Sequence, residues 1–128
     1  MKSHAQVVIV GGGIMGVSLL YHLTKEDWTD VVLIEKGELT SGSTWHAAGQ
    51  CPHFVGSYNA AKIHNYSNRL YQDLEKETGQ STGWHGCGSL RLALKEEDIN
   101  WFHYVLSLIH ISEPTRPLYI SYAVFCLK

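Results

Sequence analysis

A short apolar run that leads directly into a glycine-rich turn constrains this chain more than any other feature. Residues 7–10 read Val-Val-Ile-Val, and the pattern Gly11-x-Gly13-x-x-Gly16 follows at once. The apolar run is typical of a buried strand, and the residues from Ile14 to Leu23 have the apolar spacing of a helix. A strand, a glycine turn and a helix in this order predict a turn that approaches the pyrophosphate of a dinucleotide.

The three glycines have separate expected roles in such a turn. Gly11 permits the tight turn, Gly13 lets the backbone approach the phosphates, and Gly16 lets the helix lie against the strand. The amides at the start of the helix then face the anion, aided by the helix dipole. The candidate phosphate-binding residues are Gly11, Gly12, Gly13, Ile14, Met15 and Gly16.

A second apolar run, residues 31–34, ends in Glu35. This carboxylate follows the last glycine by about 20 residues, where a ribose-binding acid is expected. Glu35 is predicted to accept hydrogen bonds from both adenosine ribose hydroxyls and to repel a 2′-phosphate, so NADP is not expected. Lys36, next to it, is a further candidate residue. The simpler alternative is an ordinary βαβ unit with an incidental surface glutamate.

A loop of small and polar residues follows the second run. Residues 39–49 read Leu-Thr-Ser-Gly-Ser-Thr-Trp-His-Ala-Ala-Gly, so the loop can wrap a ligand closely. In a nicotinamide dehydrogenase the chain would continue here into another helix and strand, whereas a loop of this kind suits a flavin. Glu35 alone would allow either of these dinucleotides. The candidate residues are Ser41, Gly42, Ser43, Thr44, Trp45, His46, Ala47 and Gly49.

The composition excludes several other classes of protein. A net charge of −2 over 128 residues gives no electrostatic footprint for nucleic acid, and no apolar run is long enough to span a membrane. Three cysteines without metal-ligand spacing predict free thiols in a reducing compartment and no metal site. The first strand begins within a few residues of Met1. We therefore expect no targeting peptide and a cytoplasmic protein without nucleic-acid or membrane partners.

Residues 7–105 resemble the N-terminal part of the dimethylglycine and sarcosine dehydrogenase family, which belongs to the D-amino-acid-oxidase-like flavoproteins. The resemblance is carried by the segments VVIVGGGIMGVSLLYHL, VVLIEK, LTSGSTWHAAG and LEKETG. It implies an α/β fold in which residues 1–105 are the N-terminal part of an FAD-dependent oxidoreductase domain. This FAD-binding, Rossmann-like domain would be incomplete, with a parallel sheet flanked by helices.

The resemblance also implies a chemistry. In this family the His of the Thr-Trp-His motif bonds covalently to the flavin 8α-methyl group, which places the link at His46; a loop histidine with only local hydrogen bonds is the alternative. The parent enzyme would oxidise the N-methyl group of dimethylglycine by hydride transfer to FAD. One carbon would pass to tetrahydrofolate, bound by a missing C-terminal part. The isolated fragment is expected to be inactive, and the catalytic residues and electron acceptor lie beyond it.

Two relatives leave the function open. Sarcosine is an alternative N-methyl amino acid substrate, and the residues that would choose lie outside this segment. The regulatory subunit of pyruvate dehydrogenase phosphatase, a non-catalytic flavin-binding relative, is resembled as well, through residues 66–71 and 77–79. The resemblance implies that this relative lacks a histidine at the position of His46, so the pair Trp45-His46 favours the enzyme.

Three further elements are expected after the loop. The spacing predicts a helix over 59–78 with Gly79 as its stop, a strand over 89–94 and a helix over 95–105. The first of these helices would pack through an apolar stripe made of Ile63, Tyr66, Leu70 and Leu74.

The C-terminal residues 106–128 resemble a translated sequencing-library adapter. Residues 106–116, LSLIHISEPTR, match a transposase-type adapter read in one frame, and residues 120–127, ISYAVFCL, match its flow-cell primer end. Residues 117–119 fall where a sample barcode would lie. We expect this tail not to be native; a genuine pair of C-terminal strands is the alternative.

Overall fold

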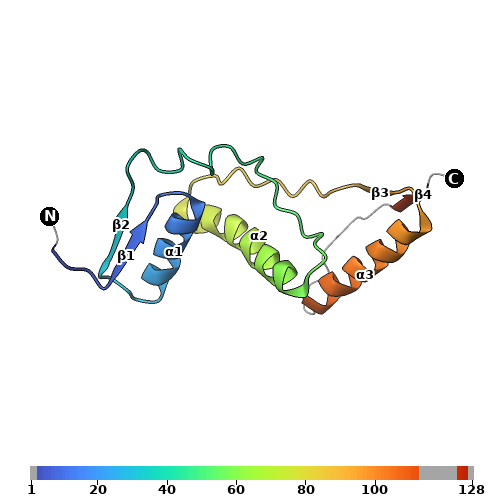
Figure 1. Cartoon of the computed structure of the whole chain (residues 1–128), viewed down its shortest axis with the longest axis horizontal. Coiled ribbons are helices and arrows are strands. Elements are labelled where there is room, and N and C mark those ends of the chain that lie inside the picture. The colour runs from blue at the N-terminus through green and yellow to red at the C-terminus, as the bar shows by residue number, and fades with distance from the viewer. Residues whose placement is uncertain (1–2, 113–123, 127–128) are drawn as a thin grey trace. The chain divides into compact units, whose positions relative to one another are not determined.

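The computed structural model describes residues 3–112 and 124–126, which form an α/β protein, as the sequence predicts (Figure 1). These residues fall into two compact units, Met1–Gln50 and Cys51–Lys128. In chain order the elements are β1 (Val7–Val10), α1 (Ile14–Lys25), β2 (Val31–Ile34), α2 (Tyr58–Thr78), β3 (Arg91–Ala93), α3 (Glu96–Ser112) and β4 (Val124–Cys126).

The first unit is a β1–α1–β2 arrangement with a parallel sheet, as predicted. Val7 pairs with Val31 and Val10 with Ile34, and α1 connects the two strands. Ile9 is the buried residue of β1, at 6% exposure, and a Cβ at Gly16 would lie 3.3 Å from Ile9 Cγ2. The helix therefore covers the Ile9 face of the sheet.

The other face of this sheet is bare. Val8 and Val10 of β1 and Ile34 of β2 are exposed, although all three are apolar. Parallel sheets are normally covered on both faces. Among the described residues this face therefore lacks the covering layer that a parallel sheet normally has.

The second unit is organised by the 21-residue helix α2. Its bounds agree with the prediction to within one residue, and its predicted stop is confirmed. Gly79 follows it with φ +69°, and its N–H bonds to the Glu75 carbonyl at 3.0 Å. Glycine adopts this left-handed conformation at little cost, which ends the helix cleanly.

The buried face of α2 differs from the predicted one. Ala61, Asn65 and Asn68 are buried, whereas Ile63 and Tyr66 are 66% and 54% exposed, so the prediction was wrong for these two residues. The cause is hydrogen bonding. The Asn68 side chain donates to the Cys51 carbonyl at 3.2 Å, and His64 Nδ1 lies 2.7 Å from the Pro52 carbonyl oxygen. Carbonyls of an extended segment need donors, and the polar face of the helix supplies them.

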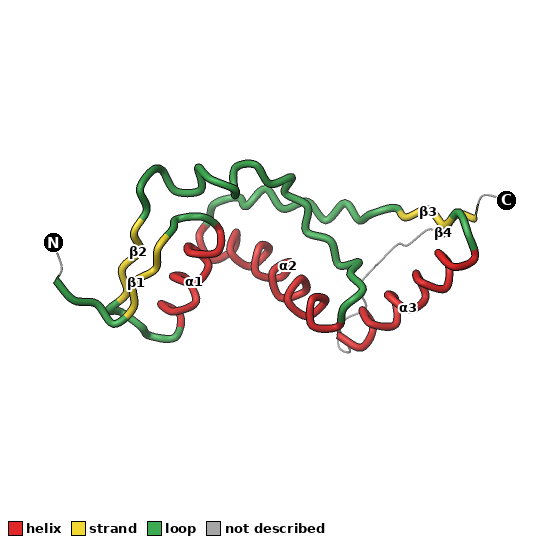
Figure 2. The backbone as a smooth tube through the Cα atoms, viewed as in Figure 1, coloured by secondary structure: helices red, strands yellow, loops and turns green. Residues whose placement is uncertain are grey.

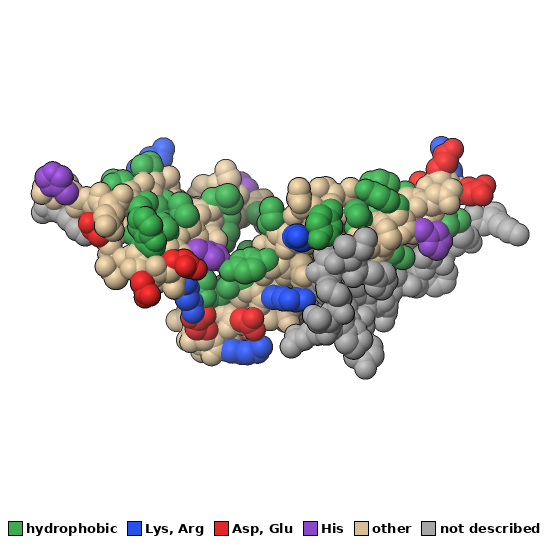
Figure 3. Space-filling model, turned by 90° about the horizontal axis from the view of Figure 1, so that it is seen from below, with side chains coloured by type: hydrophobic (Ala, Val, Ile, Leu, Met, Phe, Trp, Pro, Cys, Tyr) green, Lys and Arg blue, Asp and Glu red, His purple; other side chains and the backbone are tan. Residues whose placement is uncertain are grey.

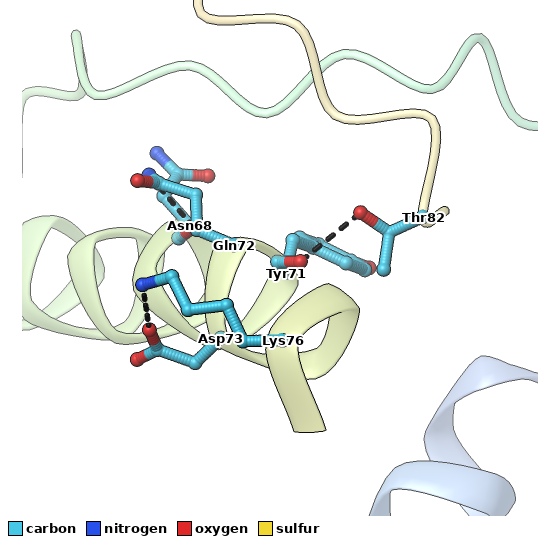
Figure 4. Close-up of polar contacts among 6 residues, drawn as sticks. All are labelled: Asn68, Tyr71, Gln72, Asp73, Lys76 and Thr82. Carbon is cyan, nitrogen blue, oxygen red and sulfur yellow. Dashed lines mark hydrogen bonds and ion pairs between the residues drawn. The ribbon is translucent and has the colours of Figure 1, made fainter. Parts of the chain in front are cut away.

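The C-terminal half of α2 carries further polar contacts (Figure 4). Gln72 donates to the Asn68 carbonyl at 3.2 Å, and Lys76 pairs with Asp73 at 3.0 Å. The hydroxyl of Thr82 donates to the Tyr71 carbonyl at 3.0 Å and so returns the chain to the helix. The bond from Thr82 fastens the segment after Gly79 to α2, whereas the other two contacts lie within the helix.

Aromatic side chains join α3 to the start of this unit. The rings of Phe54 and Phe102 meet edge to face with centroids 5.4 Å apart, and Val105 is fully buried. A Cβ at Gly56 would overlap the ring of Trp101, so the ring lies directly against the Gly56 backbone. The start of α3 agrees with the prediction to one residue, but the helix continues to Ser112 instead of ending at Val105.

The strand β3 is shorter than predicted, three residues instead of six, and pairs in parallel with β4. The register runs from Arg91 opposite Val124 to Ala93 opposite Cys126. Short apolar segments pair readily with an open strand edge, so this pairing does not decide whether residues 106–128 are native. Residues 113–123 and 127–128 of that tail lie outside the described residues.

Apolar side chains are exposed at the surface of both units (Figure 3). The most exposed are Val10, Met15, Trp45, Leu94, Ile63, Leu90 and Leu39. None of the helices in the described part of the chain has the length and apolarity needed to cross a membrane.

Candidate functional site

The glycine turn after β1 has a geometry that other residues cannot adopt. Gly11 has φ +107°, and its N–H donates to the Ile34 carbonyl at 2.8 Å, which continues the pairing of the two strands. A Cβ at Gly16 would overlap the carbonyl oxygen of Gly11. The turn is therefore tight, and the first turn of α1 lies directly against it, as the two outer glycines predict.

Gly12 is held from both sides. Its N–H donates to Glu35 Oε2 at 2.6 Å, and its carbonyl accepts from the N–H of Thr40 at 2.9 Å. A Cβ at this position would lie 2.6 Å from Leu39 Cδ2 and 3.1 Å from Glu35 Cβ. The turn between β1 and α1 thus interlocks with the chain that follows β2.

Glu35 is the centre of this interlock. Its second oxygen, Oε1, accepts from the N–H of Gly37 at 2.9 Å. The hydrogen bond from Gly12, then the one from Gly37, lower the pKa of Glu35 because both stabilise the ionised form. A carboxylate has about four lone-pair positions, so it retains acceptor capacity for a ribose hydroxyl after its backbone bonds are made.

The start of α1 meets a side chain from the distant loop. The N–H of Ile14 donates to Thr44 Oγ1 at 2.9 Å, and a Cβ at Gly13 would lie 3.2 Å from the same oxygen. The hydroxyl hydrogen of Thr44 is not used by this bond and can point to an anion. Met15, in the same first turn, has a side chain that is 82% exposed. First-turn amides have no acceptor within the helix, which suits phosphate binding.

The loop itself is a series of tight turns within the long connection from β2 to α2 (Figure 2). The N–H of Trp45 donates to the Thr40 carbonyl at 3.0 Å. The N–H groups of His46 and Ala47 donate, at 3.2 Å each, to the carbonyls of Ser43 and Thr44. The loop is therefore ordered by its own backbone.

The ring of His46 is oriented by the loop backbone. Its Nδ1 lies 3.0 Å from the carbonyl oxygen of Gly42. A carbonyl oxygen only accepts, so this contact assigns the hydrogen to Nδ1. In the neutral ring Nε2 then holds the free lone pair, and the side chain is exposed. This arrangement leaves Nε2 available as a nucleophile.

Other predicted site residues lie in the same stretch without meeting the glycine turn directly. Lys36 is exposed, and the hydroxyl of Ser41 donates to the Glu38 carbonyl at 2.8 Å. The side chain of Trp45 is 79% exposed, and Gly49 ends the loop with φ +69°.

Sequence reasoning missed Thr40. It has φ +66° and bonds to both Gly12 and Trp45 through its backbone. No sequence signal could have found it, because a β-branched residue is the last expected in a left-handed conformation. Leu39, which lies against Gly12, and Gly37, whose N–H donates to Glu35, were also missed. The contact of Leu39 with Gly12 arises only in the folded chain, whereas the bond from Gly37 joins residues two positions apart.

The residues of the first unit fit a dinucleotide cofactor. A tight glycine turn, a helix start whose Ile14 amide meets the Thr44 hydroxyl, and a carboxylate at the end of β2 are the features that such a ligand needs. Gly42 has no atom within 4 Å of a Cβ position, so the loop leaves space beside His46. Among the described residues no group of three His, Cys, Asp or Glu side chains is placed to hold a metal ion.

Comparison with known proteins supports the same assignment. The family described as FAD dependent oxidoreductase matches residues 6–113. Dimethylglycine dehydrogenase, mitochondrial, from Rattus norvegicus is 53% identical over 106 residues, which cover 83% of this chain and 12% of that protein. The chain thus spans about one eighth of the length of this relative.

Two further relatives match almost the same part of the chain. The pyruvate dehydrogenase phosphatase regulatory subunit, mitochondrial, from Mus musculus is 48% identical over 97 residues, covering 76% of this chain and 11% of that protein. Sarcosine dehydrogenase, mitochondrial, from Mus musculus is 38% identical over 109 residues, covering 84% and 12%. Both alternatives raised by the sequence are therefore homologues.

The names of these relatives correct one expectation. All three are mitochondrial proteins, which contradicts the cytoplasmic location expected from the sequence. That expectation was wrong because its two premises do not discriminate. Free thiols indicate only a reducing environment, and the few residues before β1 do not define where a longer protein begins.

Proposed function

Because the chain belongs to the family of FAD-dependent oxidoreductases, we propose that it is the N-terminal part of a flavoenzyme that oxidises the N-methyl group of dimethylglycine. The 53% identity to a dimethylglycine dehydrogenase, against 38% to a sarcosine dehydrogenase, supports the choice of substrate. The interlock of the glycine turn with the loop of His46 is the observation that carries the cofactor assignment.

Each of the interlocked residues has a proposed task. The amides of α1 and the hydroxyl of Thr44 hold the diphosphate, and Glu35 accepts the ribose hydroxyls. The negative charge of Glu35 disfavours a 2′-phosphate. The bound flavin supplies the hydride acceptor for the oxidation of the N-methyl carbon.

We propose that His46 holds the flavin covalently through Nε2, the nitrogen left with a lone pair by the bond from Nδ1 to Gly42. The link replaces one C–H bond of the 8α-methyl group by a C–N bond. His46 would supply the lone pair of Nε2, and the flavin, as a two-electron acceptor, would balance the loss of the C–H proton to solvent. The link fixes the ring beside the loop.

The remaining functions are proposed to lie outside this chain. A substrate domain, the catalytic residues and a tetrahydrofolate-binding part would follow in the longer protein. The exposed apolar residues Val8, Val10 and Ile63 support this, because they are surfaces that further parts of the protein would cover. We propose that the isolated chain is inactive and aggregates.

We propose that residues 106–128 are adapter-derived and that the native sequence continues differently after Val105. Sequencing the source locus beyond the codon of Val105 tests this. A reading frame that runs on into a substrate domain supports the proposal, whereas genomic codons for residues 106–128 followed by a stop contradict it.

The activity is tested with the full-length protein from that locus. Purified protein should carry FAD and oxidise dimethylglycine with a higher kcat/KM than sarcosine, releasing formaldehyde when tetrahydrofolate is absent. A preference for sarcosine would contradict the proposed substrate. Retention of FAD with no oxidation of either amine would favour the regulatory relative, which is the second candidate because of its 48% identity.

A further inference from the structure

We propose that Thr40 is a positioning residue whose left-handed backbone ties the loop of His46 to the glycine turn. The inference rests on the function proposed above, because it concerns how His46 is presented to the flavin. It adds to the site a residue that lies inside the loop motif of residues 39–49 but is not among the candidate binding residues expected from the sequence.

The backbone of Thr40 is strained. Among the described residues, Asp27 and Thr40 are the non-glycine positions with positive φ, at +62° and +66°. Aspartate tolerates this region moderately well, but a β-branched side chain is a genuine outlier there. Such a conformation persists only where the surroundings impose it, and these outliers cluster at functional sites.

Both backbone groups of Thr40 are engaged by parts of the site. Its N–H donates to the Gly12 carbonyl at 2.9 Å, and its carbonyl accepts from the N–H of Trp45 at 3.0 Å. One bond reaches the glycine turn and the other reaches the residue before His46. The backbone of Thr40 therefore links the glycine turn to the loop of His46 through two hydrogen bonds.

Residues on either side of Thr40 also contact the glycine turn and the start of α1. The side chain of Leu39 lies where a Cβ on Gly12 would be, and Thr44 Oγ1 accepts from the first amide of α1. The ring of His46 is in turn held by Gly42. A change of φ at residue 40 would turn the following chain away from the glycine turn, and His46 would move with it.

The test compares three variants of the full-length protein. Thr40→Pro removes the donor N–H and fixes φ near −65°. Asp27→Pro is the matched control, because it imposes the same change on the other left-handed residue, whose N–H donates to the Thr24 carbonyl at 3.2 Å. Thr40→Asn keeps the N–H and tolerates positive φ, so it should behave as wild type.

Two readouts separate positioning from general destabilisation. The first is the share of bound FAD that stays attached after denaturation. The second is the rate of hydrogen exchange at the backbone N–H of Trp45, measured after any FAD that is not covalently bound has been removed. Thr40→Pro should lower the covalent share at least tenfold and accelerate exchange at Trp45, while Thr40→Asn and Asp27→Pro leave both near wild type.

The inference is overturned if Thr40→Pro keeps the wild-type covalent share, or if Asp27→Pro lowers it equally. Should Thr40→Pro fail to fold, Thr40→Asn decides: an unchanged covalent share supports the backbone role, and a loss refutes it. If wild-type protein carries no covalent flavin, the link proposed for His46 fails, and exchange at Trp45 alone then decides the role of Thr40.

Discussion

Different interactions stabilise the interior of each of the two units. In the first, hydrogen bonds join residues more than 20 positions apart, such as Gly12 to Glu35 and Ile14 to Thr44. In the second, one long helix buries two asparagines, and aromatic rings and Val105 fill the space beside it. The first unit has the geometry of a ligand site, and the second has that of a packed scaffold.

This difference shows where substitutions should matter. In the first unit, where two backbone segments lie in contact at a glycine, even the methyl group of an alanine cannot be accommodated. In the second unit, the loss of stability on truncating a side chain depends on how deeply that side chain is buried. Four substitutions, ordered by expected effect, test the contrast in the full-length protein.

The largest effect is expected for Gly16→Ala. The added Cβ would overlap the Gly11 carbonyl oxygen, and backbone cannot move aside as a flexible side chain can. We expect a loss of about 3 kcal/mol in stability, at the upper end for overpacking, together with loss of FAD. Urea unfolding and flavin content measure the two effects.

Gly42→Ala is the control for this change. No atom lies within 4 Å of the Cβ it would add, so the stability should change by less than about 0.5 kcal/mol. Equal losses for both glycines would show that the glycine turn is not tightly packed against α1.

The next effect is expected in the second unit, for Asn68→Ala. Its side chain is 1% exposed and donates to the Cys51 carbonyl, which would be left without this donor. The expected cost is about 2 kcal/mol, with FAD content per folded protein unchanged. Gln72→Ala, an exposed neighbour on the same helix, should cost less than about 0.5 kcal/mol. If Asn68→Ala lost FAD while Gln72→Ala did not, the second unit would contribute to the ligand site, which contradicts the contrast between the units.

The sequence predicted the first unit well because its signals are local. The apolar runs and the glycine pattern gave β1, β2 and the start of α1 to the residue. The left-handed conformation of Thr40 could not be predicted, since its N–H bonds to Gly12, which is distant in the sequence.

The second unit was predicted in outline only. The bounds of α2 follow from its spacing and from Gly79, which are both local. Its buried face does not, because the carbonyls of residues 51 and 52 bond to Asn68 and His64 on the polar side of the helix, while Ile63 stays exposed. Periodicity identifies an apolar stripe, but the partner that covers it is set by tertiary structure.

A smaller effect is expected for Glu35→Gln, and it depends on pH. The backbone bonds from Gly12 and Gly37 lower the folded pKa of Glu35 below its ordinary value of 4.5. A depressed pKa contributes stability above pH 4.5 that is lost as the pH falls through the folded pKa. The variant should bind FAD about tenfold more weakly at pH 7, and its stability deficit should shrink below pH 4.5.

The exposed neighbour Glu38 provides the comparison for this titration. Glu38→Gln should leave the affinity for FAD and its pH dependence near wild type, as measured by flavin fluorescence. A stability deficit of Glu35→Gln that stays constant from pH 7 to pH 3 would contradict the hydrogen-bonded carboxylate.

The smallest effect is expected for Lys76→Ala on α2. The ammonium lies 3.0 Å from Asp73 Oδ1, but the two side chains are 78% and 65% exposed. Solvent screens such a pair, so its loss should cost at most about 0.5 kcal/mol. A double-mutant cycle with Asp73→Ala isolates the pair, and a coupling above about 1 kcal/mol would show that this face is covered in the full-length protein.

Mass spectrometry of the full-length protein tests the central claim most directly. Trypsin releases residues 37–62 as one peptide, which contains His46 and His53. The account predicts that this peptide carries FAD, that fragmentation places it on His46, and that His46→Gln releases the cofactor on denaturation. Flavin attached to another residue, or a wild-type peptide without flavin, would contradict it.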